Sequence, residues 1–294
     1  MAKPSSKAVK EKKQVALLSV FAAIFLTSSK FIIGMMTGSL GILSEALHSA
    51  LDLIAAVITY FSVRISDKPA DRDHHYGHGK VENISALLET FLLLITCSWI
   101  IYEAIQRLLT GQVQIEVTPW SYLVVITSII IDLWRSRALS KAAKTYNSQA
   151  LEADALHFST DIWSSTVVFI GLLSANFGWH YADPIAALIV ALIVIYVSYK
   201  LGKKSIDVLL DKAPDAYMSI IEEILKNNSR ITYFHDLRIR VAGANVFVDI
   251  SIHVDPQMTI EDVHQITDEV ESRIQQKIPR SVVQIHQEPE DNRH

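Results

Sequence analysis

The chain has 294 residues, of which 50% are hydrophobic, and its mean hydropathy is +0.26. This composition excludes an ordinary soluble protein and predicts a chain that crosses a membrane. The formal net charge of −4 argues against nucleic-acid binding, for which a concentrated basic face is expected.

Six apolar stretches are each long enough, at about twenty residues, to cross a hydrocarbon core of about 30 Å. They cover residues 15–37, 40–64, 84–108, 119–140, 150–176 and 183–202. The first has no small-residue cleavage site, so a transmembrane helix is expected there rather than a secretory signal. The connections 37–39, 109–119 and 175–183 contain no lysine or arginine, whereas the tail and the other connections are basic. The positive-inside rule therefore predicts cytoplasmic termini, and the untargeted N-terminus favours a bacterial cytoplasmic membrane.

After residue 210 the chain becomes polar and is patterned for a small cytosolic α+β domain. Helices are expected at 216–227 and 260–277, and strands at 236–241, 245–254 and 282–286, a metallochaperone-like αββαβ order. Thr259 is the expected N-cap of the second helix, with Asp262 at the third helical position. The predicted organisation is a basic cytosolic tail at 1–13, a six-helix transmembrane transport domain at 14–208 and the cytosolic domain at 209–294.

One polar pattern occurs twice inside apolar spans. An acid, a histidine and an aspartate follow at offsets 0, 3 and 7 in Glu45, His48 and Asp52 and again in Asp154, His157 and Asp161. On a helix these offsets place the three groups on one face. A charge at the bilayer centre costs about 2.5–3.5 kcal/mol on insertion scales, so intramembrane ionisable groups point to function. Hydrogen bonding between helices is the alternative use of such groups.

The two faces, turned together, would offer a metal ion two imidazoles and two carboxylates. The four ligands are His48, Asp52, His157 and Asp161. This set suits tetrahedral Zn²⁺ and also accepts Fe²⁺, Co²⁺, Cd²⁺ or Mn²⁺, so the preferred metal stays open. Two ionised aspartates and two neutral histidines would balance the charge of the ion.

Metal and protons would compete for the same four groups, which is the basis of a metal/proton antiporter. Glu45 and Asp154, one turn before each histidine, are expected either to orient an imidazole or relay protons, or only to face water near a helix end. Outside the two stripes, Asp132 is the acidic residue expected within a span. A polar contact near Trp134 and Arg135 is expected for it, with a role in proton access as the alternative.

These features resemble the cation diffusion facilitator family. Six spans, a metal quartet drawn from the second and fifth, a His-rich Gly-x-Gly-Lys segment before the third span and a small cytosolic domain carry the resemblance, which covers residues 14–289. It implies a homodimeric carrier, not an enzyme, whose quartet exports divalent metal in exchange for protons. A histidine at the first position of the second-span motif implies a preference for zinc.

The resemblance also assigns the connection between the second and third spans. Asp71, His74 and His78 match an accessory metal site of the family, and a solvated polar loop is the alternative. Lys80 and Asp211 match a charge interlock at the family's dimer interface.

A third group of candidate ligands lies in the cytosolic domain. His235, His264 and His286 match a two-metal cluster of the family, with Glu288 where aspartate is commoner. The chain departs from the pattern on its second strand, where Ser251 stands at the usual histidine position and His253 follows two residues later. The shift keeps the strand face but moves the ligand about 7 Å. These five positions imply a regulatory metal cluster whose ligands are open.

Two other classes of protein use similar ligands. An intramembrane metalloenzyme would need a general base beside an open metal position, and the chain contains no His-Glu-x-x-His motif. A membrane metal sensor or a passive metal channel would bind without proton exchange, and turnover separates these from a carrier. Cys97, the single cysteine, excludes a thiolate metal site.

Overall fold

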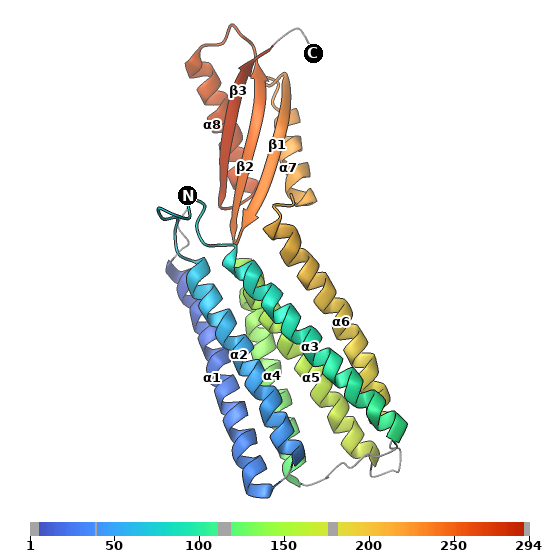
Figure 1. Ribbon diagram of the computed structural model, residues 1–294. Helices are drawn as coiled ribbons and strands as arrows, with labels where there is room; N and C mark the ends of the chain where they lie inside the picture. Colours follow the sequence, from blue (N-terminus) through green and yellow to red (C-terminus); the bar gives the residue numbers. More distant parts are fainter. Residues whose placement is uncertain (1–5, 39, 111–118, 176–181, 291–294) are drawn as a thin grey trace. The chain divides into compact units, whose positions relative to one another are not determined.

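The structure, a computed structural model, describes residues 6–38, 40–110, 119–175 and 182–290. Six long helices form a bundle in Figure 1: α1 (Ser6–Thr37), α2 (Leu40–Ser66), α3 (Val81–Thr110), α4 (Pro119–Tyr146), α5 (Gln149–Ala175) and α6 (Ala182–Leu209). At least one end of each helix lies within three residues of the corresponding end of a predicted span. The start of α1 and the ends of α4 and α6 extend further, by turns that contain lysine. The connections 109–119 and 175–183, which carried part of the orientation argument, lie largely outside the described residues.

Three of these helices are long and apolar enough to cross a membrane by length and composition, within Lys7–Met36, Glu45–Ser66 and Val81–Thr110 of the described chain. α4 and α6 run past the predicted span ends at 140 and 202 to Tyr146 and Leu209. The two extensions contain four lysines in thirteen residues, and lysine favours helix without being apolar enough to count as span. The hydropathy window therefore stops before the helix does.

The predicted basic tail differs from the structure, because residues 6–13 are the first turns of α1. Lys12 is buried there, and its Nζ lies 2.5 Å from Asp67 Oδ1 and 3.4 Å from Glu82 Oε1. Glu82 also accepts hydrogen bonds from Ser66 (2.8 Å) and Ser148 (2.6 Å). This buried cluster ties α1, α2, α3 and α5 together at one end of the bundle.

Small residues let the helices approach closely. α1 packs on α2 and α4 packs on α5, and the second and fifth helices also contact each other. The buried cluster at these contacts contains Ala16, Ala23, Ala56, Ala143 and Ala150. Close approach of α2 and α5 is what brings the two polar stripes into reach of each other.

The C-terminal part is the predicted αββαβ domain: α7 (Asp215–Lys226), β1 (Tyr233–Ala242), β2 (Asn245–Val254), α8 (Ile260–Lys277) and β3 (Ser281–Pro289). The sheet order is β1-β2-β3, with β1 and β2 antiparallel and β2 and β3 parallel. α7 packs beside β1 and α8 beside β3 (Figure 1). The predicted fold class, a helical membrane domain followed by a small α+β domain, is confirmed.

Sequence patterns explain this domain well. Val246, Val248, Ile250 and Ile252 alternate along β2 and are all buried in the core against α7 and α8. Thr259 is the N-cap of α8 and forms a capping box with Asp262, as predicted. β1 starts three residues before its predicted start, at Tyr233, because a bulge between His235 and Arg238 interrupts the alternation that marks a strand.

Candidate metal centre

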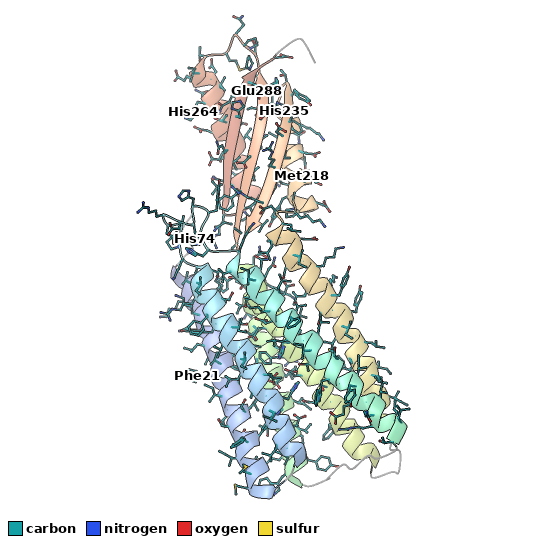
Figure 2. The ribbon with its side chains drawn as sticks, in the orientation of Figure 1. Phe21, His74, Met218, His235, His264 and Glu288 are labelled. Carbon is teal, nitrogen blue, oxygen red and sulfur yellow. The ribbon has the colours of Figure 1, made fainter. Side chains whose placement is uncertain are left out.

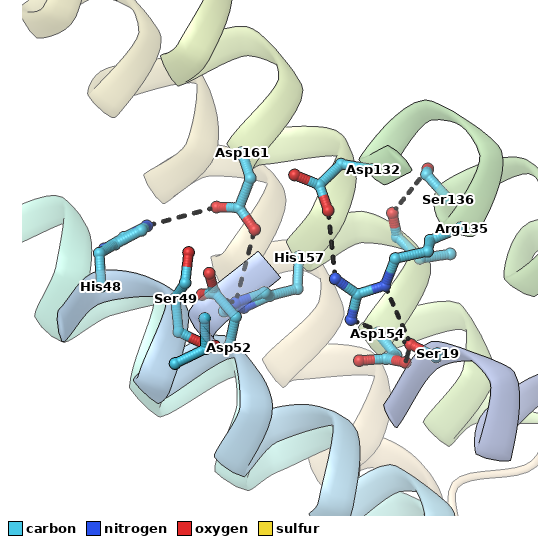
Figure 3. A network of polar contacts seen from close by, with 12 residues as sticks. Ser19, His48, Ser49, Asp52, Asp132, Arg135, Ser136, Asp154, His157 and Asp161 are labelled. Atoms are coloured by element: carbon cyan, nitrogen blue, oxygen red, sulfur yellow. Dashed lines mark hydrogen bonds and ion pairs between the residues drawn. The ribbon is translucent and has the colours of Figure 1, made fainter. Parts of the chain in front are cut away.

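The two stripes meet between α2 and α5. His48 and Asp52 come from α2, and His157 and Asp161 come from α5 (Figure 3). Asp52, His157 and Asp161 are buried, and the His48 side chain is 31% exposed. The spacing of four residues within each pair turns both ligands of a helix toward the other helix.

Three separations within the quartet are close to those around a small tetrahedral ion. His157 Nε2 lies 3.0 Å from Asp52 Oδ1 and 3.8 Å from Asp161 Oδ2, and His48 Nε2 lies 3.6 Å from Asp161 Oδ1. Ligand bonds of about 2.0–2.1 Å in a tetrahedron place ligand atoms about 3.3 Å apart. Buried Asp161 Oδ2 and His157 Nδ1 have no hydrogen-bond partner. The donor set therefore fits Zn²⁺ in its chemistry, with His48, Asp52 and Asp161 gathered within 4.8 Å and His157 beside Asp52.

Glu45 lies outside this cluster and pairs with a lysine. Lys30 on α1 places its Nζ 3.1 Å from Glu45 Oε2 and donates to Ser49 Oγ at 2.9 Å. Lys30 is buried, whereas the Glu45 side chain is 43% exposed. The pair fixes α1 against the first turns of α2, next to His48.

Asp154 belongs to a second buried network that includes an arginine (Figure 3). Its Oδ2 accepts a hydrogen bond from Ser19 on α1 at 3.3 Å. Arg135 on α4 donates to the same Ser19 oxygen at 3.1 Å and to Asp132 Oδ1 at 3.1 Å. The guanidinium also lies 3.4 Å from the centre of the Phe158 ring. Asp132 thus makes the expected polar contact with Arg135.

Sequence reasoning missed that several charged groups are buried in the bundle, among them Lys30, Glu89 and Arg135. The statement that Asp132 is the acidic residue within a span outside the stripes is wrong, because Glu89 lies within the predicted third span and is fully buried. The signal was available, since any ionisable residue inside an apolar span calls for a partner or a function.

The predicted accessory site forms in the connection between α2 and α3. The ligand atoms of Asp71, His74 and His78 lie within 4.8 Å of one another. Asp71 Oδ1 accepts from the His74 N–H at 2.7 Å and the Asp73 N–H at 3.0 Å, and Oδ2 lies 3.3 Å from His78 Nε2. The backbone N–H of His74, then that of Asp73, holds the pKa of Asp71 below its usual range. The carboxylate is therefore ionised and oriented at neutral pH.

This loop packs on the β1–β2 hairpin of the cytosolic domain. The Tyr76 ring lies 5.1 Å from that of Phe247, and the Arg240 guanidinium stacks 3.6 Å from the centre of the Tyr76 ring. A Cβ on Gly79 would stand 2.4 Å from the carbonyl oxygen of Ala242, so only glycine allows this approach. Two residues of the loop are thus in direct contact with the domain.

Replacing Arg240 with methionine is expected to loosen the loop. A partly desolvated cation–π contact contributes about 1–2 kcal/mol, so backbone amides at 69–80 should exchange about tenfold faster with solvent. Hydrogen exchange read by mass spectrometry on the full chain measures this. Arg238→Met is the matched control, because the Arg238 side chain is 76% exposed on the same strand. Equal exchange in both variants would contradict the role of the stack.

The two residues of the predicted charge interlock lie together within one chain. Lys80 Nζ is 2.7 Å from Asp211 Oδ1 and donates to the Leu209 carbonyl at 3.3 Å. Asp211 has a φ of 57°, in the left-handed region, just after α6 ends. The lysine caps this helix end.

In the cytosolic domain the structure brings together His235, His253 and Glu288, one from each strand (Figure 2 labels the first and last). Glu288 Oε1 lies 3.6 Å from His235 Nε2, and Oε2 lies 3.7 Å from His253 Nε2. Glu288 stands beside His253 in the β2–β3 register, and Ser251 stands beside His286. The displaced histidine therefore still reaches the acid, which lies two residues after His286 on β3.

The remaining two histidines occupy different positions. His286 Nε2 lies 3.6 Å from Glu288 Oε1, but its side chain is 71% exposed at the edge of the cluster. His264 on α8 faces Asp268 at 3.6 Å, apart from the three clustered ligands. His264 and Glu288 do line a common hollow with Val254 and Met258. Of the five predicted ligands, three form one cluster. His286 lies at the edge of that cluster, and His264 lies across a hollow from it.

Family models match almost the whole chain. The model described as the cation efflux transmembrane domain matches residues 16–210, and the cation efflux protein cytoplasmic domain matches residues 213–290. The quartet lies in the first matched region, and the three-strand cluster lies in the second.

Several proteins are similar over nearly their full length. A cation-efflux pump FieF of Shewanella oneidensis is 30% identical over 278 residues, 94% of each chain. An uncharacterized transporter of Methanocaldococcus jannaschii is 31% identical over 280 residues, 94% of this chain and 99% of its own. The solved metal-bound C-terminal domain of the CzcD transporter from Thermotoga maritima is 26% identical, covers 27% of this chain and 93% of its own, and has a TM-score of 0.26.

Proposed function

The chain belongs to the cation diffusion facilitator family of cation efflux transporters, and we propose that it carries Zn²⁺ out of the cytoplasm in exchange for protons. The observation that carries the proposal lies between α2 and α5, where His48, Asp52 and Asp161 have ligand atoms within 4.8 Å of one another and His157 Nε2 lies 3.0 Å from Asp52. The transporter is a secondary active carrier and not an enzyme, and its energy comes from the proton gradient.

The ligand chemistry supports zinc as the substrate. A mixed set of nitrogen and oxygen donors at tetrahedral spacing suits Zn²⁺, whereas Mg²⁺ and Ca²⁺ prefer oxygen alone. Two ionised aspartates offset both charges of the ion, so the loaded quartet is neutral within the apolar bundle. Fe²⁺, Cd²⁺, Co²⁺ and Mn²⁺ meet the same donors and are the alternative substrates.

Proton exchange follows from the same groups. Without metal, Asp52 and Asp161 leave two negative charges beside two imidazoles, each of which lies near a carboxylate oxygen. Protons taken up by these four groups restore neutrality, and a metal ion must displace them. Asp154 and Glu45 are proposed to act outside the ligand set, Asp154 in the proton path and Glu45 by holding α1 against α2.

The assembly and its control are part of the proposal. We infer a homodimer in a bacterial cytoplasmic membrane, with both termini in the cytoplasm and the Lys80–Asp211 pair at the dimer contact. The loop ligands (Asp71, His74, His78) and the C-terminal ligands (His235, His253, His264, His286, Glu288) are proposed to bind Zn²⁺ as regulatory sites. The dimer would contain two copies of each cluster. Metal bound to these clusters would strengthen the dimer contact when the cytosolic metal concentration rises.

Competition between metals in sealed vesicles tests the substrate. The full-length protein is reconstituted, a fixed pH gradient is imposed, and uptake of Zn²⁺ is measured against Fe²⁺, Cd²⁺, Co²⁺ or Mn²⁺. Zn²⁺ is expected to be carried at the lowest concentration and to inhibit the others. A sensor would bind zinc without turnover, and an open channel would show flux that does not saturate. Either result would contradict the carrier.

A further inference from the structure

Glu89 is a buried acid that is not one of the four metal ligands. It lies on α3 and is fully buried. Its Oε1 accepts hydrogen bonds from the hydroxyl groups of Thr59 on α2, at 2.5 Å, and of Ser85, at 3.2 Å. Its Oε2 is buried and has no hydrogen-bond partner. Two helices thus supply this buried carboxyl group with only two neutral donors.

The surroundings of Glu89 favour a protonated carboxyl group while the quartet holds no metal. Among the described residues, no lysine or arginine forms an ion pair with it. An ionised carboxylate in an apolar interior without a cation partner is strongly disfavoured. A proton on Oε2 would remove the charge and supply the donor that this oxygen lacks.

A second buried acid stands nearby on α5. Asp154 is fully buried, and its Oδ1 has no hydrogen-bond partner. α3 packs on α5, and the Glu89 and Asp154 carboxyl groups interact electrostatically. The charged groups that act on this pair are His157 and Asp161 on α5 and Arg135 on α4. Two acids near one another, each with a free oxygen, form a place where a proton can be held and passed.

The pair is also coupled to the metal ligands. Asp154 lies one helical turn before His157, nearer the start of α5, and His157 acts electrostatically on Glu89. A dication in the quartet adds positive charge on the side of His157. That charge stabilises an ionised Glu89, so arrival of the metal favours loss of the proton.

We propose that Glu89 is a proton-binding residue of this carrier, separate from the metal ligands. While the quartet is without metal, Glu89 holds a proton on Oε2; when metal binds, the O–H bond breaks, its electron pair stays on the carboxylate, and the proton passes by way of Asp154 to water. The inference rests on the proposed metal/proton exchange and names a group that sets how many protons are exchanged.

Metal-induced proton release tests this directly. Zn²⁺ is added to the full-length protein in weakly buffered detergent solution, and the released protons and bound zinc are counted together. Glu89→Gln should release about one proton fewer per zinc ion than the parent, while zinc affinity changes by less than about threefold. Glu103→Gln is the matched control on the same helix, since the Glu103 side chain is 46% exposed and paired with Arg107.

The outcomes are distinct. If the parent releases no protons, the exchange itself fails. If the parent releases protons and Glu89→Gln releases as many, the exchange stands and the assignment of Glu89 is wrong. Zinc binding by the quartet reports whether the variant is folded.

Thr59→Val, a nearly isosteric change, is the second variant. It removes a hydrogen-bond donor that stabilises the ionised Glu89 carboxylate, so it should also lower the number of protons released per zinc ion. Unchanged release in Thr59→Val, when Glu89→Gln does not fold, would overturn the proposal.

Discussion

Vesicles containing Asp52→Ala or Asp161→Ala protein are expected to take up zinc at least about 100-fold more slowly than the parent. Loss of a group that merely supports a metal ligand costs about 10–100-fold in affinity, so loss of a ligand costs at least the upper end. Each alanine also leaves the quartet one negative charge short of neutralising the ion. Both effects act on the same buried cluster, in which His157 Nε2 lies 3.0 Å from Asp52.

The control for these variants is Asp249→Ala, which removes an exposed aspartate of β2 in the cytosolic domain. Its transport rate should equal that of the parent. Asp52→Asn separates charge from shape, because it keeps an oxygen donor but not the negative charge, and it should fall between alanine and parent. Zinc transport by Asp52→Ala and Asp161→Ala at the parent rate would show that the site has been assigned to the wrong residues.

The second large effect concerns the buried arginine. Arg135→Met is expected to destabilise the bundle by about 3–5 kcal/mol, the usual consequence of removing one partner from a buried charge network. Arg135 is 2% exposed and donates hydrogen bonds to both Asp132 and Ser19. The Ser19 hydroxyl in turn donates a hydrogen bond to Asp154. Without the guanidinium, Asp132 loses its ion pair and Asp154 loses the cation that shares Ser19 with it.

Thermal unfolding in detergent measures this change. Arg137→Met, two residues later on α4 and exposed, is the matched control and should unfold near the parent temperature. The double variant Arg135→Met with Asp132→Asn should regain part of the loss, because asparagine needs no counter-charge. If Arg135→Met is as stable as Arg137→Met, the network contributes nothing to the bundle.

The meeting of the two polar stripes was predictable because each stripe is local. Four-residue spacing on a helix fixes which side chains share a face, and the pattern occurs twice, so the sequence alone indicates that the two faces meet. The same holds for β2 and for the cap at Thr259, where alternation and a capping box are properties of neighbouring residues.

Partners on other helices were not predictable in this way. Nothing in the spacing of Arg135 indicates Ser19, which is 116 positions away, and nothing near Lys30 indicates that Glu45 faces it. The contact of Tyr76 with Arg240 likewise joins a loop to a distant strand. Such pairs depend on how helices pack, which hydropathy does not encode.

The cytosolic cluster shows an intermediate case. The family pattern matched His235, His264 and His286, with Glu288 where aspartate is commoner, and His253 departed from it by two residues. The parallel register of β2 and β3 resolves its place, because it puts His253 beside Glu288. Register is set by the pairing of two strands, which neither strand reveals alone.

Zinc accumulation driven by a pH gradient tests the central claim most directly. The full-length protein is reconstituted in sealed vesicles with an acidic interior, and zinc is supplied outside at a concentration below that inside. The account predicts saturable uptake against the zinc gradient, with protons leaving as zinc enters, and loss of accumulation when a protonophore removes the pH gradient. Zinc movement that only follows its own concentration gradient, whatever the pH difference, would contradict it.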